Sequence, residues 1–393
     1  MVQGAKMTKK VYYSSLGVHN YMESLIKNPP EGYEFVVNAN ERTGDIVKKL
    51  RTNKMARSIY KSFIKKIFNV FLIMRKINYE KSPDNIDLIF STSTIVDEKK
   101  PWIIKILDLS PFAMAGNDYD LFIKNRKKLE EALSSQYCKK IIVHTNKAKE
   151  TMEKYFSDEV LRKVVKVNPA IPLENRGIKK NKENVTFLFM GSINNPEEFL
   201  IKGGLETLRT FDALEKKYNN VKLIVKCRVQ DEIKKQFPSK NITYIDGRIS
   251  VEELNKIYDE ADALMMPGYC YFVMAYLEAF SHSIPIIALD TYGVSEFISE
   301  GKTGFIVKPS EKMPINSPRY PPNMKSKEFL NAIVEGDDLV IKELTEKASR
   351  LIEDKNLISS MKKECQKTVK EKYSFDKKRE ILKEIFDEAL ENV

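Results

Sequence analysis

Residues 241–307 constrain the fold more than any other part of the chain, because segments typical of strands and helices alternate in them at short intervals. Residues 241–248 are rich in β-branched side chains and end in Asp-Gly-Arg, which predicts a strand followed by a turn. Ser250 and Glu253 have the spacing of a capping box, which predicts a helix directly after that turn. Residues 263–267 form an apolar run that is too short for a helix and suits a buried parallel strand. A strand, a helix and a strand in this order predict half of a doubly wound sheet.

A second helix is predicted over residues 272–281, after Gly268 ends the preceding strand. The first amides of a helix have no partner within it, and here they would face the carboxyl end of that strand. Such amides attract phosphate groups. The order of the elements therefore predicts a phosphate pocket at this edge of the sheet.

The rest of the chain repeats the alternation of strands and helices, which predicts parallel sheets covered by helices on both faces. Predicted strands of the first half lie at residues 10–17 (with a glycine-bearing turn), 33–37, 88–92, 102–106 and 140–143. Residues 165–184 break the rhythm with two prolines and a charged run, which predicts the connection between two domains. Strands of the second half are predicted from Val185 onward and at 221–225, 242–245, 263–266, 284–288 and 305–307.

The composition suits a globular protein of two or three domains, since 42% of the 393 residues are apolar and 31% are charged. No run of about 18 apolar residues is present, and the polar start lacks the apolar segment of a signal peptide, so we expect a cytoplasmic protein. The four cysteines are isolated and far apart, which predicts neither a disulfide framework nor a metal site. The formal charge of +11 suits an anionic partner, which can be a nucleotide sugar, an acidic membrane surface or nucleic acid.

Several motifs of the second half, taken together, resemble those of a known enzyme family. They are residues 249–267, 277–288, 293–296 and 301–307, with 187–191 and 202–204 upstream and 351–354 and 373–376 downstream. The combination resembles the carboxyl-terminal domain of the retaining, GT-B type glycosyltransferases of family four (glycosyl transferases group 1). The resemblance is strong from Val185 to the end of the chain and weak before it.

This resemblance implies an α/β GT-B fold, in which two doubly wound, Rossmann-like parallel-sheet domains face a cleft. Residues 1–175 would form the acceptor-side domain, residues 176–372 the nucleotide-sugar-binding domain, and residues 373–393 a helix that crosses back to the first domain. It also implies a hexosyltransferase without a cofactor, which moves a hexosyl group from a nucleotide diphosphate sugar to a hydroxyl acceptor with retention. The acceptor would be a glycan or a lipid-linked group. In such enzymes the departing phosphate takes the acceptor's proton, so no strong side-chain base is required.

Lys202 and Glu278 are the predicted catalytic residues. Lys202 occupies the family's phosphate-binding lysine position, and Gly203 after it lets the backbone come close to an anion. Glu278 would lie about 9 Å along the axis from the start of its helix, where it could reach ribose hydroxyls while the helix start holds phosphate.

Further residues complete the predicted site. The donor-binding set consists of Gly17, Gly191, Gly203, Arg228 and the helix-start residues Phe272, Val273 and Met274. The acceptor-side residues are His19 and Asp108. The turn at Gly17 fits equally a plain connection from strand to helix. We expect the other two histidines, His144 and His282, to be structural.

Three positions depart from the family pattern. Cys270 stands where the first acid of the usual Glu pair belongs, Ser192 where an arginine commonly follows the glycine, and Leu107 where a histidine is often found. A thiol does not accept hydroxyl donors as a carboxylate does. Arg228 is a candidate for supplying the missing positive charge. The alternative function is therefore a catalytically impaired sugar-nucleotide-binding protein of the same fold.

Residues 55–79 leave two interpretations open, because an apolar face is flanked there by basic side chains. Such a helix can lie on the anionic inner face of a membrane, as a peripheral protein, and bring the enzyme to a lipid-linked acceptor. It can also cover the sheet of the first domain, and both hold if the basic flank stays exposed. Nucleic acid is not expected as a partner, because the chain lacks a recognition motif and an aromatic–basic stacking segment.

Overall fold

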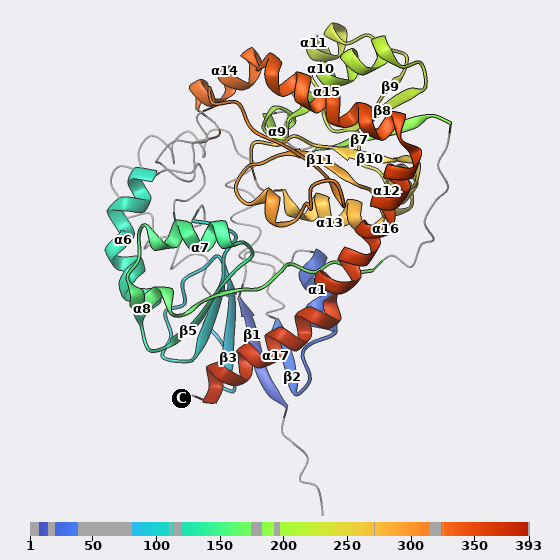
Figure 1. The fold of residues 1–393 in the computed structure, drawn as a ribbon. Coiled ribbons are helices and arrows are strands. Elements are labelled where there is room, and N and C mark those ends of the chain that lie inside the picture. Colours follow the sequence, from blue (N-terminus) through green and yellow to red (C-terminus); the bar gives the residue numbers. More distant parts are fainter. Residues whose placement is uncertain are drawn as a thin grey trace, which may run out of the picture. The chain divides into compact units, whose positions relative to one another are not determined.

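The chain forms two compact units, each built around its own parallel sheet (Figure 1). Unit 1 comprises Met1–Pro169 and Phe375–Val393, and unit 2 comprises Ala170–Ser374. The computed structural model describes residues 8–14, 20–37, 81–109, 112, 119–173, 183–191, 197–270, 272–313, 324 and 326–391. Among these residues, no helix combines the length and the apolar character that a membrane span requires. The predicted amphipathic segment 55–79 lies outside the described residues.

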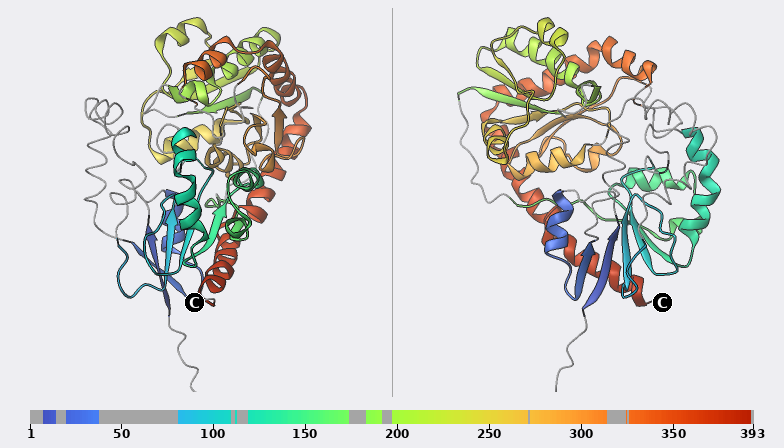
Figure 2. Two further views of the ribbon diagram at one scale, coloured as in Figure 1. Left: turned by 90° about the vertical axis from the view of Figure 1, so that its left-hand side faces the viewer. Right: turned by 180° about the vertical axis from the view of Figure 1, so that it is seen from behind.

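Unit 1 contains a six-stranded parallel sheet with the strand order β2-β1-β3-β4-β5-β6. Its strands are β1 (Lys9–Ser14), β2 (Tyr33–Val37), β3 (Leu88–Thr92), β4 (Trp102–Lys105), β5 (Cys138–Val143) and β6 (Val164–Lys166). Its described helices are α1 (Asn20–Lys27), α6 (Tyr119–Ser134), α7 (Asn146–Glu153), α8 (Asp158–Leu161) and α17 (Phe375–Glu391). Alternate residues of each strand point to opposite faces, so Val11 and Tyr13 join one core while Tyr12 joins the other. Helices α1 and α17 cover the first face, and α6, α7 and α8 cover the second (Figures 1 and 2).

Helix α17 closes its face of the sheet through aromatic packing. The Phe386 ring is fully buried and makes edge-to-face contacts with the rings of Tyr33, Phe35 and Phe90. Aromatic pairs of this geometry add a favourable electrostatic interaction to the burial of apolar area. Residues of α17, near the end of the described chain, therefore complete the core against the sheet that contains β1.

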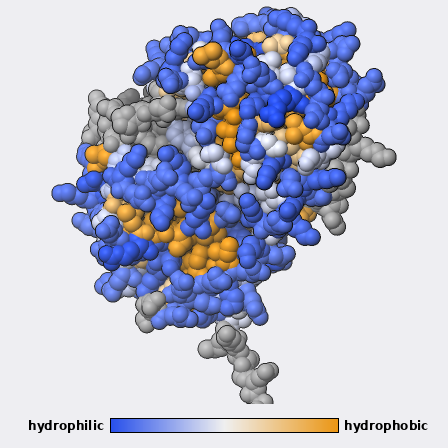
Figure 3. Space-filling model, in the orientation of Figure 1, coloured by the Kyte–Doolittle hydropathy of each residue, from blue (hydrophilic) through white to orange (hydrophobic). Residues whose placement is uncertain are grey.

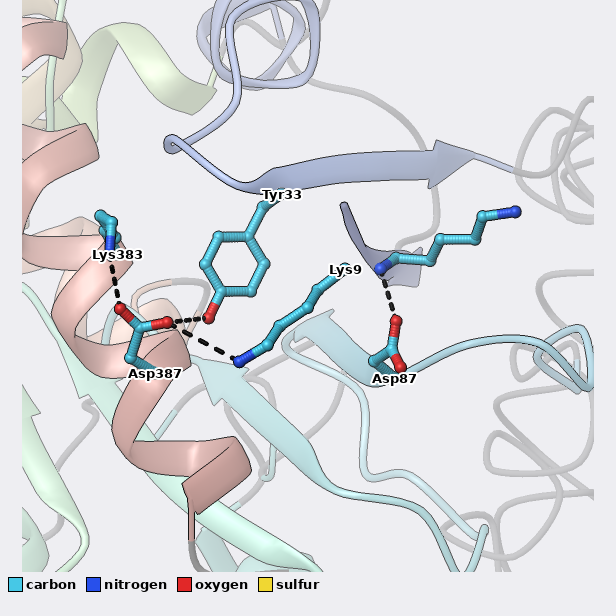
Figure 4. A network of polar contacts seen from close by, with 6 residues as sticks. Lys9, Tyr33, Asp87, Lys383 and Asp387 are labelled. Carbon is cyan, nitrogen blue, oxygen red and sulfur yellow. Dashed lines mark hydrogen bonds and ion pairs between the residues drawn. The ribbon is translucent and has the colours of Figure 1, made fainter. Parts of the chain in front are cut away.

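A polar network beside Phe386 fixes the register of α17 on the sheet (Figure 4). The Asp387 carboxylate accepts hydrogen bonds from the Tyr33 hydroxyl at 2.5 Å and from the Lys383 ammonium at 2.7 Å, and Lys9 lies 3.9 Å away. Burial, together with the bond to Asp387, raises the pKa of Tyr33 above its usual value. The Tyr33 hydroxyl therefore stays protonated and serves as the donor.

We expect Phe386→Ala to destabilise unit 1 by about 3–5 kcal/mol, the usual cost of deleting a buried phenylalanine ring. Trp102, the only tryptophan of the sequence, is buried in β4 of the same unit, so its fluorescence during urea unfolding reports on that unit. Phe329→Ala is the matched control, because Phe329 is also buried but belongs to unit 2. A Trp102 transition that does not move in Phe386→Ala would contradict the structural role of α17.

Unit 2 contains the second six-stranded parallel sheet, with the order β12-β11-β10-β7-β8-β9. Its strands are β7 (Val185–Met190), β8 (Val221–Lys226), β9 (Ile242–Tyr244), β10 (Ala263–Met265), β11 (Ile286–Leu289) and β12 (Gly304–Val307). Its described α-helices are α9 (Glu197–Ile201), α10 (Gly204–Lys217), α11 (Asp231–Gln236), α12 (Val251–Glu260), α13 (Val273–Ser281), α14 (Lys327–Glu335), α15 (Asp338–Glu353) and α16 (Lys355–Lys372). Helix α10 packs with α15 on one face, and α13 packs with α16 on the other (Figure 1).

The strand order of unit 2 reverses direction between β7 and β10. From β7 the chain builds outward through β8 to β9, then returns to the other side of β7 and continues through β10, β11 and β12. In sheets of this kind, the helices on either side of the reversal lie on opposite faces, which leaves a crevice at the carboxyl ends of the two central strands. Ligands bind at that crevice in open α/β sheets.

The structure confirms the two doubly wound sheets and most of the elements predicted for residues 241–307. The capping box is present in full: the Glu253 amide donates to Ser250 Oγ at 3.1 Å, and the Ser250 amide donates to the Glu253 carboxylate at 2.8 Å. The strand predicted within 241–248 is β9, which ends at Tyr244, and the chain bends at Gly247, where the sequence predicts a turn. On the face drawn in Figure 3, hydrophilic residues cover most of the surface and separate the apolar areas.

Candidate functional site

The candidate site lies at the carboxyl ends of β7, β8 and β10, at the reversal of strand order in unit 2. Gly191 follows β7, Arg228 lies two residues after β8, and Gly268 follows β10. The turn at Lys202 and Gly203, which comes after β7, approaches the same edge. Segments that follow three different strands therefore meet at one place.

Gly203 determines how closely two of these connections approach each other. It is the N-cap of α10 with a φ of +82°, a left-handed conformation that glycine adopts without strain. A Cβ at this position would collide with the carbonyl group of Pro267. The Thr207 hydroxyl donates to the Gly203 carbonyl at 2.8 Å and lies 3.3 Å from the Met265 carbonyl, which ties the turn to the end of β10.

Lys202 directs its ammonium group toward the start of α13. Its Nζ lies 4.8 Å from the centroid of the Phe272 ring and 3.7 Å from the Glu198 carboxylate. The Lys202 side chain is 15% exposed, so its charge is less screened than that of a surface lysine. A Cβ at Gly268 would lie 3.0 Å from the Phe272 ring and 3.5 Å from Lys202 Cα, so the lysine, the glycine and the ring form one compact group.

The start of α13 has the features of an anion site. Phe272 is its N-cap, and no side chain caps the helix there. Helix starts leave their first amides without intrahelical partners and carry a partial positive charge. The amides of Val273 and Met274 therefore lie in the first turn of a helix whose N-cap ring contacts the Lys202 ammonium. A cation and a helix start side by side favour a phosphate group.

Glu278 lies in the second turn of α13. It accepts a hydrogen bond from the Tyr258 hydroxyl at 2.8 Å, and Tyr258 in turn stacks on His282 with 4.6 Å between the ring centroids. Burial raises the pKa of Glu278, while the bond from Tyr258 and the charge of Lys202 act in the opposite direction. The carboxylate and the lysine are therefore close enough to interact electrostatically. His282, at the end of α13, lies 3.6 Å from Asp259 and has the structural position that the sequence predicts.

The ends of β7 and β8 are packed together on the other side of the turn. A Cβ at Gly191 would collide with the Cys227 sulfur, so glycine is required there. Burial raises the pKa of the Cys227 thiol to about 11, against the opposing charges of Lys202 and Lys226. The next residue, Arg228, is exposed at the same edge of the sheet.

The structure thus brings together Lys202, Gly203, Phe272, Glu278 and Gly191 from the predicted site. Asp108 belongs to unit 1, where it follows β4 beside Leu107, whose side chain is 44% exposed. Gly17, His19 and Ser192 lie outside the described residues. The buried His144, whose Nδ1 lies 2.6 Å from the Val167 carbonyl, has a pKa lowered by burial and is structural, as expected.

Two aromatic partners at this site were not predicted from the sequence. Tyr258 holds Glu278, and the Tyr269 hydroxyl donates to the buried Glu206 carboxylate at 2.6 Å. A signal for the second pair was present, because Glu206 interrupts the apolar stripe of α10 between Leu205 and Leu208. No group of three or more potential metal ligands occurs within the part of the chain that the structure describes.

The comparisons with known proteins agree with this geometry. Residues 184–315 match the model of the family described as glycosyl transferases group 1. No curated protein sequence matches the chain. The matched residues extend from β7 to β12 of unit 2 and include Lys202, Phe272 and Glu278.

Three solved structures illustrate the likeness in fold. The sucrose-phosphate synthase of Thermosynechococcus elongatus matches with a TM-score of 0.64 at 12% identity over 98% of this chain and 100% of its own. HepE of Anabaena, in complex with UDP, matches with a TM-score of 0.57 at 12% identity over 97% of this chain and 100% of its own. TarM of S. aureus matches with a TM-score of 0.53 at 15% identity over 81% of this chain, which spans 57% of TarM. At such identities the likeness shows the fold alone.

We expect Gly203→Ala to destabilise unit 2 by about 3 kcal/mol or more, because the methyl group meets both backbone strain and the Pro267 carbonyl. Gly301→Ala is the matched control: its φ is +72°, but no atom lies within 4 Å of the added Cβ. The control should cost only about 1–2 kcal/mol for the left-handed conformation. Urea unfolding followed by circular dichroism measures both, and equal losses would contradict the close approach of Gly203 to Pro267.

Proposed function

We propose that this protein is a retaining hexosyltransferase that moves a sugar from a nucleotide diphosphate sugar to a hydroxyl acceptor. One observation carries the proposal: the Lys202 ammonium lies 4.8 Å from the Phe272 ring, beside the uncapped start of α13, at the reversal of strand order. A diphosphate at this place would receive charge from the lysine and hydrogen bonds from helix-start amides.

The proposed residue roles follow from what the leaving group needs. Negative charge grows on the diphosphate as the bond to the sugar breaks, and a cation and backbone dipoles fixed beside it stabilise that charge. Lys202 and the amides of Val273 and Met274 take this role in the proposal. Glu278, held by Tyr258, accepts hydrogen bonds from the ribose hydroxyls. A side-chain base is not required, since the departing phosphate takes the acceptor's proton.

The other predicted residues complete the proposal. Gly191 and Gly203 allow the backbone to approach the donor, and Arg228 adds a positive charge at the end of β8. Gly17 is proposed to approach the donor from the first strand, and His19 and Asp108 are proposed for the acceptor side. HepE is solved with UDP and with UDP-glucose, which supports UDP-sugars as the first donors to test here. A glycan or a lipid-linked acceptor, and attachment to an anionic membrane surface through residues 55–79, remain predictions.

Lys202→Ala is expected to weaken the binding of a nucleotide diphosphate sugar about 10- to 100-fold, because a hydrogen bond to a charged group contributes about 1.5–3 kcal/mol. Thermal shift against UDP-, GDP- and ADP-sugars measures this, since a ligand that binds only the folded state raises its stability. Lys216→Ala is the matched control, because Lys216 lies on α10 with its side chain 72% exposed and pairs with Asp212. Equal shifts for wild type and Lys202→Ala would contradict the proposed diphosphate site.

A sugar-nucleotide-binding protein without transferase activity is the second candidate. It is favoured by Cys270, a partly buried thiol where the family pattern has a carboxylate. Release of the free nucleoside diphosphate from a bound donor, with and without acceptors, separates the two candidates. Release that is lost in Lys202→Ala supports the enzyme, and tight binding without release supports the binding protein.

A further inference from the structure

Tyr269 bridges the turn that carries Lys202. Its backbone amide donates to the Ile201 carbonyl at 2.8 Å, and its hydroxyl donates to Glu206 Oε1 at 2.6 Å. Ile201 immediately precedes Lys202 and Gly203, and Glu206 lies in the first turn of α10 after them. The loop after β10 is therefore fastened to the chain on both sides of the Lys202–Gly203 turn.

Glu206 is an unusual residue for its surroundings. It is 1% exposed and lies between Leu205 and Leu208 on the inner side of α10. One oxygen accepts from Tyr269, while Oε2 has no hydrogen-bond partner among the described residues. Burying a carboxyl group is unfavourable unless it is hydrogen-bonded, and an apolar side chain would pack at this position at lower cost. Among the described residues, Tyr269 is the side chain that donates a hydrogen bond to this acid.

The groups that act on Glu206 and Tyr269 come from three elements. Arg209 on α10 and Tyr269 on the loop after β10 act on the carboxyl directly, and Asp337 at the start of α15 acts on Tyr269. Burial raises the pKa of Glu206 to about 7, against the bond from Tyr269 and the charge of Arg209. Both protonation states are therefore populated near neutral pH. The ionised state places a buried negative charge three residues after Gly203.

We infer that Glu206 is a positioning residue for the diphosphate site, because through Tyr269 it holds the loop after β10 against the Lys202–Gly203 turn. Its ionisation weakens the binding of an anion at that turn through like-charge repulsion. The inference rests on the proposed function and deepens it. Glu206 itself does not touch the ligand in this arrangement, since it acts from beneath the turn through the tyrosine.

The first test removes the hydroxyl that Glu206 holds. The probe is whichever of UDP, GDP and ADP binds the wild type most tightly, and calorimetry gives its dissociation constant at pH 6.5. Tyr269→Phe is expected to weaken that binding about 5- to 10-fold, as expected for a lost hydrogen bond to a charged or buried partner. Tyr218→Phe is the matched control, because Tyr218 makes the same kind of bond, to Glu353, at the other end of α10.

The second test uses Glu206→Gln, which keeps the size of the side chain and an acceptor for Tyr269 but does not ionise. The dissociation constants of wild type and variant are compared from pH 6 to pH 8.5. The wild-type constant divided by that of Glu206→Gln is expected to rise about threefold or more as the pH passes about 7. The reason is that only the wild type acquires the buried charge. A purely structural role for Glu206 would leave this ratio constant.

Thermal unfolding of the free proteins checks that both variants fold. The proton bound to Glu206 stabilises the fold below its ordinary pKa of 4.5, and this contribution is lost as the pH rises through about 7, so the melting temperature of Glu206→Gln should depend less on pH over that range. A ratio of dissociation constants that does not change with pH would overturn the inference but not the proposed function. A Tyr269→Phe variant that binds with wild-type affinity would do the same. Failure of the wild type to bind any of the three nucleotides overturns the proposed function, and the inference with it.

Discussion

The close approach of Gly203 to the Pro267 carbonyl is the constraint on which the candidate site depends. It occurs where the strand order of unit 2 reverses, and it requires a residue with no side chain and a left-handed backbone. Because the two connections touch, Lys202 at the end of one reaches the helix that follows the other. A bulkier residue at 203 would separate the cation from the helix start, and neither of them alone would hold a diphosphate well. Lys202 and the start of α13 can therefore act together on an anion only because these two segments of backbone are in contact.

Burial shifts the pKa values of several groups around this contact in the same direction. The pKa values of Glu206, Glu278 and the Cys227 thiol are all raised, and desolvation is the largest cause for each. Perturbed ionisable groups that gather at one edge of a sheet are typical of functional sites. The Lys202 side chain is itself only 15% exposed, so its charge acts more strongly on an incoming anion than it would in water.

The sequence predicted the parts of this protein that local patterns specify. The capping box at Ser250 and the alternation of strands and helices depend on neighbouring residues, and both are present in the structure. The bonds from Tyr258 to Glu278 and from Tyr269 to Glu206 join residues 20 and 63 positions apart, so their partners follow only from the packed fold. The strand Ile242–Tyr244 and the bend at Gly247 are specified locally in the same way as the capping box.

The place of α17 in unit 1 has a consequence for biosynthesis. The Phe386 ring and Leu382 belong to the core beneath β1 and β3, yet the ribosome makes them after every strand of both sheets. The part of that sheet face that α17 covers therefore stays exposed while the whole of unit 2 is synthesised and folds. Nascent chains with such a face are prone to aggregate and are natural clients of chaperones. A premature stop before residue 375 would leave all of unit 2 intact and still produce a protein that quality control removes.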